Sequence, residues 1–138
     1  MRVATIDDLP LITSLAGELG YPASAEEMVP RLTALLATPE TDAVFVTDAG
    51  WIHVALVKSL ESAPFAEIRG LVVAETRRGR GLGAELVAAA EEWARTRGVA
   101  RIRVRSNVKR ERTHAFYERL GYDTTKSQKV FDKKLAGS

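Results

Sequence analysis

The segment RRGRGLG, residues 77–83, constrains the fold of this chain more than any other stretch. It holds three glycines and three arginines in seven positions, between an apolar run of strand character, FAEIRGLVV (65–73), and a helical pattern that ends before Gly98. Strand, glycine-rich turn and helix in that order are typical of phosphate-binding sites, because the first N–H groups of the helix are unpaired and carry the positive end of its dipole. A solvated basic loop or a tight corner explains the glycines alone, whereas glycines and arginines together favour an anion site.

Known phosphate-binding motifs fit this segment only in part. No Walker A ending, GK followed by Ser or Thr, accompanies the glycines. Residues 79–84 match the dinucleotide fingerprint in its G-x-G-x-x-A form, but the match begins past the middle of the chain. The acid expected about 20 residues later is missing, because that position falls in RIRVR (101–105). Too little chain remains for a dinucleotide-binding fold, so another phosphorylated ligand is expected.

The composition indicates an ordinary globular protein. The chain has 138 residues, 46% hydrophobic and 28% charged, which predicts one domain over residues 1–138. No apolar run reaches the ~20 residues needed to cross a bilayer, so no membrane span is expected. The absence of cysteine excludes disulfides, thiolate catalysis and Cys-ligated zinc, and no metal site is predicted. The N-terminal residues do not resemble a secretory signal, so we expect a cytoplasmic location.

The charges are unevenly distributed, although the formal net charge is only +2. Acidic residues are concentrated in the first half of the chain, and the basic stretches RRGR, RIRVR and VKRER lie in the second half. This predicts an anionic partner for the C-terminal half, either nucleic acid or a phosphorylated cofactor. The basic stretches show no interleaved aromatic residues and no metal-finger spacing, which argues against nucleic acid.

The spacing of apolar and turn residues predicts a single mixed α/β domain. Ser24 followed by Glu27 is a capping box at the start of a helix, and the turn at residues 48–50 joins two strands into a hairpin. Gly98 and Gly121 are expected to end helices. We expect strands at residues 2–4, 43–46, 51–57, 65–73, 101–105 and 129–135, and helices at residues 7–19, 24–36, 82–97 and 115–120.

Two segments resemble the GCN5-related N-acetyltransferases, which transfer an acetyl group from acetyl-CoA to an amine. Arg78, Gly81 and Gly83 fit the acetyl-CoA signature of that family, and the run LVV (71–73) resembles the strand end that precedes it. AFYERLGY (115–122) resembles the family's helix that carries a tyrosine near the cofactor thiol. The order of elements matches over nearly the whole chain. The resemblance implies a central, mostly antiparallel sheet flanked by helices, and an acetyl-CoA-dependent N-acetyltransferase.

The resemblance also implies where acetyl-CoA binds. Backbone N–H groups of the glycine segment would bind its pyrophosphate, and the strand before it would pair with the pantetheine arm, with one N–H polarising the thioester carbonyl. The family often has an asparagine seven residues before the tyrosine, whereas here Asn107 stands ten residues before Tyr117. The implied cofactor contacts are Leu71, Val72, Val73, Arg78, Gly79, Arg80, Gly81, Leu82, Gly83, Ala84, Asn107 and Phe116.

Tyr117 is the general acid that the resemblance implies, protonating the CoA thiolate as it leaves. A phenol suits this role because it is protonated at neutral pH. The alternative is a core aromatic residue. Phe116 shares a helical stripe with Leu120, while Tyr117 lies about 100° away from it, so Phe116 is the better candidate for the core.

Glu67 is the predicted general base, which must take a proton from the attacking amine. It lies in an otherwise apolar strand, where burial would make a carboxylate a stronger base. The alternatives are a solvated Glu67 paired with Arg69 on the same strand face, and His53 as the base or as the partner of a relay water.

By the same resemblance, the acceptor side is expected to include Tyr21, from the turn between the first two helices, together with Trp51 and His53 from the hairpin. Aromatic residues next to the carboxylate of Glu67 suit a cation, so the expected partner is an amine-bearing small molecule or peptide. The sequence leaves the oligomeric state open, a homodimer included. Two other functions stay open: a nucleic-acid- or ribosome-binding module that uses the basic C-terminal half, and a sensor that binds acetyl-CoA without catalysis.

Overall fold

The computed structural model describes residues 1–18, 20, 22–105 and 111–136. Contacts within the chain divide it into two compact units, Met1–Arg105 and Ser106–Ser138, and each unit is described here by itself. No helix in these described ranges is both long enough and apolar enough to span a membrane.

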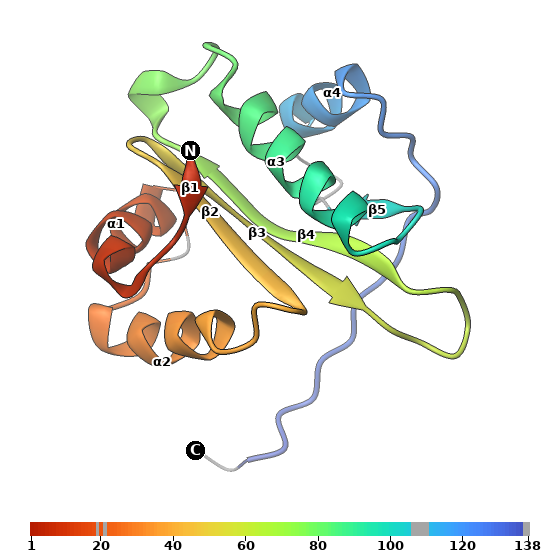
Figure 1. Ribbon diagram of the computed structural model, residues 1–138, viewed down its shortest axis with the longest axis horizontal. Coiled ribbons are helices and arrows are strands. Elements are labelled where there is room, and N and C mark those ends of the chain that lie inside the picture. Colours follow the sequence, from red (N-terminus) through yellow and green to blue (C-terminus); the bar gives the residue numbers. More distant parts are fainter. Residues whose placement is uncertain (19, 21, 106–110, 137–138) are drawn as a thin grey trace. The chain divides into compact units, whose positions relative to one another are not determined.

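A five-stranded sheet forms the centre of the first unit, and its strands are paired in the order in which they occur in the chain (Figure 1). The first four strands are antiparallel, and β5 runs parallel to β4. The predicted hairpin is confirmed, with Asp48 and Ala49 as its two-residue turn. The strands are β1 (Arg2–Val3), β2 (Asp42–Thr47), β3 (Gly50–Val57), β4 (Phe65–Val73) and β5 (Ile102–Val104).

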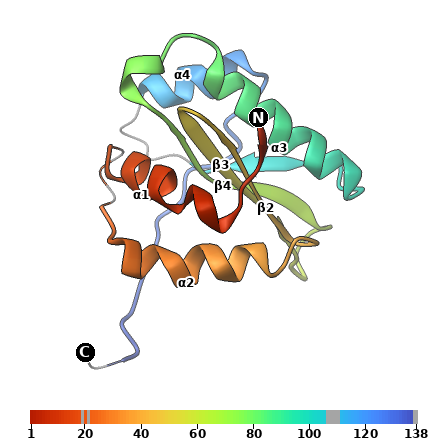
Figure 2. The same ribbon diagram turned by 60° about the vertical axis from the view of Figure 1, so that its left-hand side comes forward.

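Helices cover both faces of this sheet. The helices α1 (Leu9–Glu18) and α2 (Ala25–Leu36) pack on one face, and α3 (Leu82–Thr96) packs on the other (Figures 1 and 2). Two short 3₁₀ helices, η1 (Ile6–Asp8) and η2 (Glu75–Arg77), precede α1 and α3. The predicted mixed α/β fold with a mostly antiparallel sheet is therefore confirmed.

Strand alternation decides which side chains meet which helices. In the antiparallel register Val44 pairs with His53 and Val46 pairs with Trp51, so these four side chains share one face of the sheet. Val44 and Val46 are buried there with residues of α1 and α2, and Trp51 packs against the same cluster. Ile52, at an alternate position of β3, is fully buried on the opposite face, toward α3.

The helix boundaries follow from their capping residues. Ser24 accepts a hydrogen bond from the N–H of Glu27, whose carboxylate accepts one from the N–H of Ser24, so the predicted capping box is confirmed. At the first turn, Asp8 is buried and forms a bidentate ion pair with Arg2, with N–O distances of 2.6 and 2.8 Å. The hydrogen bond from Arg2 is the main cause that holds the pKa of Asp8 below its ordinary value.

The second unit contains α4 (Glu111–Arg119), which begins earlier than the predicted residue 115. Gly121 has a φ of 92° and follows the end of α4, as predicted. The predicted strand at residues 129–135 is wrong, because residues 122–135 form neither helix nor strand. Val130 and Phe131 are adjacent and both are exposed, so this segment lacks the alternation of buried and exposed residues that stabilises a strand.

Candidate active site

The glycine segment forms a turn that leaves the start of α3 uncapped. Gly79 and Gly81 have φ values of 79° and 81°, in the left-handed region where glycine is favoured. Gly81 is the N-cap of the 15-residue helix α3 and makes no side-chain cap, and the N–H of Glu85 bonds to its carbonyl at 3.1 Å. The N–H groups of the first three helical residues, 82–84, consequently have no partner within the helix. This end of α3 offers donors and a positive dipole to an anion.

The three arginines of this segment have different surroundings. Arg77 forms an ion pair with Asp48 at 3.2 Å, on the exposed hairpin turn. The Nε of Arg78 donates to the carbonyl oxygen of Val73 at 3.3 Å, which connects the segment to the end of β4. Arg80 is exposed. The role of Arg78 and Arg80 in binding a pyrophosphate stays a prediction.

Beyond Ile68, β4 has one edge that no described strand covers. β5 pairs with β4 at Ala66, Glu67 and Ile68, and the described part of β5 ends soon afterwards. The N–H of Ala74 bonds to Ala49 at 2.7 Å, toward β3, and backbone groups alternate in direction along a strand. The N–H and C=O groups of Leu71 and Val73 therefore point away from β3, toward the open edge. An extended ligand can add to this edge as another strand would.

A β-bulge interrupts β4 where the open edge begins. His53 pairs with Gly70 and Val54 pairs with Ile68, which leaves Arg69 as the additional residue. Trp51 lies against Gly70, since a Cβ added at Gly70 would be 2.9 Å from the indole ring. Any larger residue at Gly70 would displace the ring. No local pattern in the sequence indicates this contact, because the register of β3 against β4 creates it.

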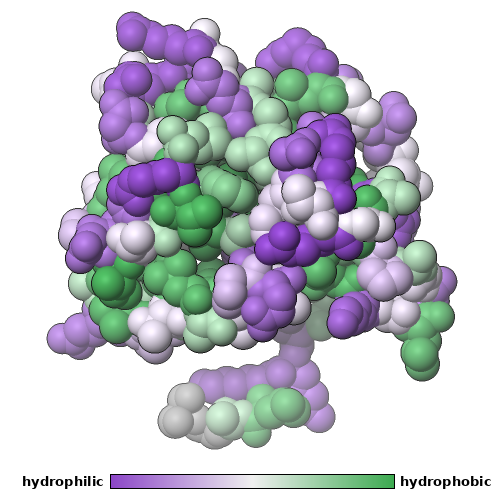
Figure 3. Space-filling model, in the orientation of Figure 1, coloured by the Kyte–Doolittle hydropathy of each residue, from purple (hydrophilic) through white to green (hydrophobic). Residues whose placement is uncertain are grey.

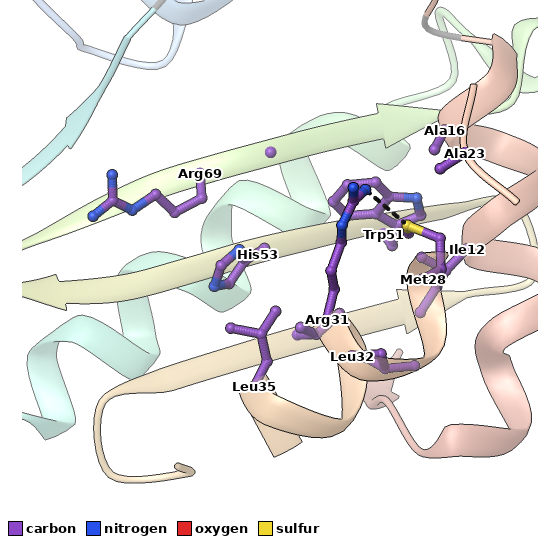
Figure 4. A pocket seen from close by; sticks show the side chains of 12 residues that line it. Ile12, Ala16, Ala23, Met28, Arg31, Leu32, Leu35, Trp51, His53 and Arg69 are labelled. Carbon is purple, nitrogen blue, oxygen red and sulfur yellow. Dashed lines mark hydrogen bonds between the residues drawn. The ribbon is translucent and has the colours of Figure 1, made fainter. Parts of the chain in front are cut away.

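A pocket of about 320 Å³ lies between the sheet and the layer of α1 and α2 (Figure 4). Figure 3 shows apolar residues gathered on the side of these helices, with hydrophilic residues around them. Trp51 and His53, both predicted acceptor-side residues, line the pocket, and Tyr21 lies outside the described residues. The pocket is lined by Ile12, Ala16, Ala23, Met28, Arg31, Leu32, Leu35, Val44, Trp51, His53, Arg69 and Gly70.

His53 is oriented by a carboxylate that sequence reasoning missed. Its Nε2 lies 3.0 Å from Oδ1 of Asp42, at the start of β2. The second oxygen of Asp42 accepts hydrogen bonds from Thr41 at 2.9 Å and from Thr38 at 3.2 Å. Burial raises the pKa of Asp42, but the hydrogen bonds from His53, Thr41 and Thr38 together outweigh it, so this pKa is lowered. No single motif in the sequence indicates the pair, because Asp42 and His53 meet through the hairpin register.

Glu67 is buried but paired. One of its oxygens lies 2.5 Å from Nη1 of Arg69, and the other lies 3.3 Å from Nε of Arg105. Glu67 is therefore buried, as predicted, and it is also paired with Arg69, as in the alternative interpretation. Glu67 is not among the described residues that line the pocket, so the carboxylate expected beside Trp51 is missing from its described lining. Its role as the general base stays a prediction.

Tyr117 belongs to the second unit. It is buried, and burial raises its pKa to about 12, so its phenol is protonated at neutral pH. Its ring packs edge-on against Phe116 and Tyr122, with centroids 5.0 and 5.5 Å away. The prediction that Phe116 takes the core position in preference to Tyr117 is wrong, because Phe116 is only half-buried. Asn107 lies outside the described residues.

The uncapped helix start, the open strand edge beside it and the fold together define a class of protein. The model of the acetyltransferase (GNAT) family matches residues 22–122, and the chain belongs to this family. The predicted family and the predicted class of enzyme, an acyltransferase with acetyl-CoA as its cosubstrate, are confirmed.

Similar proteins agree with this assignment. The chain is 30% identical to an aminoglycoside N(6′)-acetyltransferase type 1 of Stenotrophomonas maltophilia, over 87% of this chain and 84% of that protein. It is 45% identical to an aminoalkylphosphonate N-acetyltransferase of Salmonella typhimurium, over 56 residues that make up 41% of this chain and 36% of that protein. The fold matches the structure of AAC(6′)-Iy in complex with the bisubstrate analog CoA-S-monomethyl-acetylneamine, with a TM-score of 0.84, 18% identity and 96% of each chain covered.

Proposed function

We propose that this acetyltransferase moves the acetyl group of acetyl-CoA to a primary amine of a small molecule by direct attack. In that reaction the amine nitrogen bonds to the carbonyl carbon and the C–S bond of the thioester breaks. One proton leaves the amine for a base, and the CoA thiolate receives one proton from an acid. The observation that carries the proposal is the uncapped start of α3, placed at the end of the open edge of β4.

The cofactor is proposed to lie along these two features. The N–H groups of Gly81 and of residues 82–84 bind the pyrophosphate of CoA, because a helix start combines free donors with a positive dipole. The backbone groups of Leu71 and Val73 pair with the amides of the pantetheine arm. When bound, acetyl-CoA would supply an activated acyl group, and a backbone N–H near the bulge at Arg69 is proposed to polarise its carbonyl.

Tyr117 is proposed as the general acid and Glu67 as the general base, with His53 as the rival base. The high pKa of Tyr117 keeps its proton available at neutral pH. His53 lines the pocket and is held by Asp42, whereas both oxygens of Glu67 are paired with arginines. A base at Glu67 therefore acts through water, and a base at His53 acts directly.

The two acceptor classes suggested by the relatives differ in charge. Aminoglycosides are polycations, and aminoalkylphosphonates combine an amine with an anion. Both are candidate acceptors for this chain, because both present a primary amine.

Acetyl-CoA binding and thiol release test the proposed function in two separate measurements. Acetyl-CoA at 100 times its Kd should stabilise the folded protein by about 2.7 kcal/mol in thermal unfolding. Thiol release should then depend on both acetyl-CoA and an added amine. A thermal shift without thiol release from any amine would favour the sensor, and no shift at millimolar acetyl-CoA would refute the cofactor site.

A further inference from the structure

The charged side chains in the described lining of the pocket are all basic. Arg31 extends from α2 to the indole of Trp51, whereas the guanidinium of Arg69 extends along β4 away from Trp51 (Figure 4) and pairs with Glu67. His53, the third polar side chain of the lining, is hydrogen-bonded to Asp42. The other described lining residues are apolar or glycine. None of the described residues that line the pocket has a carboxylate, and this is unfavourable for binding a polycationic acceptor.

Arg31 keeps most of its charge available. Its nearest carboxylate is Glu27 at 3.9 Å, and both side chains are more than half exposed, so this pair is weak. Its Nη1 also lies 3.8 Å from the sulfur of Met28, a weak acceptor.

Arg69 is paired, but its surroundings are still positive. Glu67 faces two guanidinium groups, those of Arg69 and Arg105. One carboxylate cannot neutralise two cations, so this cluster, in which the carboxylate is buried and the two guanidinium groups are exposed, holds one positive charge in excess. The excess charge lies at the bulge, next to the part of β4 whose open edge is proposed to hold the pantetheine arm.

The size of the pocket limits the acceptor. A volume of about 320 Å³ equals roughly ten water molecules at ~30 Å³ each, near the lower end for ligand pockets. The apolar wall formed by Trp51, Met28 and Leu35 suits a short hydrocarbon or aromatic part.

We propose that the acceptor is a small amine that also carries an anionic group, a carboxylate, phosphonate or phosphate. Arg31 attracts the anionic group, Trp51 contacts the apolar part, and the amine faces Gly70, next to the bulge at Arg69. This assignment rests on the proposed function and names its substrate class. It replaces the cationic acceptor expected from the sequence, because the carboxylate of Glu67 is withdrawn from the pocket by its two arginines.

Calorimetric binding tests this proposal without requiring turnover. With CoA present, the wild-type protein is titrated with two matched pairs, phenylalanine and phenethylamine, and 2-aminoethylphosphonate and ethylamine, and with kanamycin as a polycation. Within each pair the two amines differ by the anionic group. In at least one pair, the anionic member should bind at least tenfold more tightly than its partner and than kanamycin. Equal binding within both pairs, tighter binding of kanamycin, or no anionic amine binding below 10 mM would overturn the proposal.

Arg31→Met should weaken binding of the amine that carries the anionic group at least tenfold, without weakening binding of its partner that lacks this group. Arg31→Lys should restore part of the lost affinity. Arg95→Met is the matched control, because Arg95 forms a similar exposed pair with Glu92 at 3.4 Å on α3. An equal loss in Arg31→Met and Arg95→Met would contradict a specific role for Arg31. Thiol release from the same amines tests the proposed function separately, since binding and turnover can fail independently.

Discussion

Gly81→Ala is expected to weaken acetyl-CoA binding beyond its effect on stability. Gly81 has a φ of 81°, and an added Cβ would have no other atom within 4 Å. The cost to folding is therefore conformational, about 1–2 kcal/mol for an L-residue in the left-handed region. Acetyl-CoA binding is weakened in one of two ways. Either the added Cβ occupies the place where the pyrophosphate is proposed to approach the backbone, or the backbone changes its conformation and its N–H groups no longer point toward the pyrophosphate.

The same helix provides a matched control. Gly98 follows the other end of α3 with a φ of 77°, and an added Cβ there also has no other atom within 4 Å. Gly98→Ala should lose a similar ~1–2 kcal/mol of folding free energy. It should leave acetyl-CoA binding unchanged, since it lies at the opposite end of the helix from the proposed site.

Thermal unfolding with and without acetyl-CoA separates the two effects. At 100 times the wild-type Kd, the ligand adds about 2.7 kcal/mol to wild-type stability and to Gly98→Ala. A tenfold weaker Kd in Gly81→Ala reduces this to about 1.4 kcal/mol. Equal stabilisation of both variants by acetyl-CoA would refute the assignment of the pyrophosphate to the start of α3.

The site and the fold support four further predictions. Tyr117→Phe should lower kcat at least tenfold in thiol-release assays without changing the Kd of acetyl-CoA, and an unchanged kcat would exclude the general-acid role. Glu67→Gln and His53→Gln should be compared by pH–rate profiles. The substitution that removes the general base should abolish the acidic limb of the profile, and the other substitution should leave that limb in place. Asp8→Asn should lower the free energy of unfolding by about 1–2 kcal/mol at pH 7, because it breaks the charged hydrogen bonds to Arg2. The pKa of Asp8 is lowered in the folded state, so the stabilisation by its carboxylate is complete above about pH 5 and is lost as the pH falls below ~4. Urea unfolding should therefore show the stabilities of the wild type and the variant converging in acid. Single-stranded RNA should not bind at physiological salt, and a binding constant that falls steeply with salt in filter binding would instead support the nucleic-acid alternative.

Local signals in the sequence predicted most of the fold. The capping box at Ser24 and Glu27 depends on residues three positions apart, and the glycines that follow α3 and α4 act on their own helices. These interactions need no knowledge of the sheet. The predicted strand at residues 129–135 was wrong because its apolar residues do not alternate, so β propensity alone overestimated it.

The site was harder to predict because it depends on register. Trp51 and His53 were found from their shared strand face, but Asp42 and Gly70 come close to them only through pairing across β2, β3 and β4. Arg31 carries no sequence signal, since an exposed arginine in a helix usually has no ligand. The positive charge of the pocket therefore emerged only from the arrangement of the strands and α2.

The additional residue in β4 shifts the alternation of the strand by one position. Before Arg69, the odd-numbered Glu67 faces the layer of α1 and α2, and after it the even-numbered Gly70 takes that side. In an uninterrupted strand, Arg69 would take the place of Gly70 opposite His53, and Leu71 would take the place of Val72 opposite Trp51. The additional residue thus leaves a glycine, without a side chain, opposite His53 on this face of the sheet, where the indole of Trp51 lies.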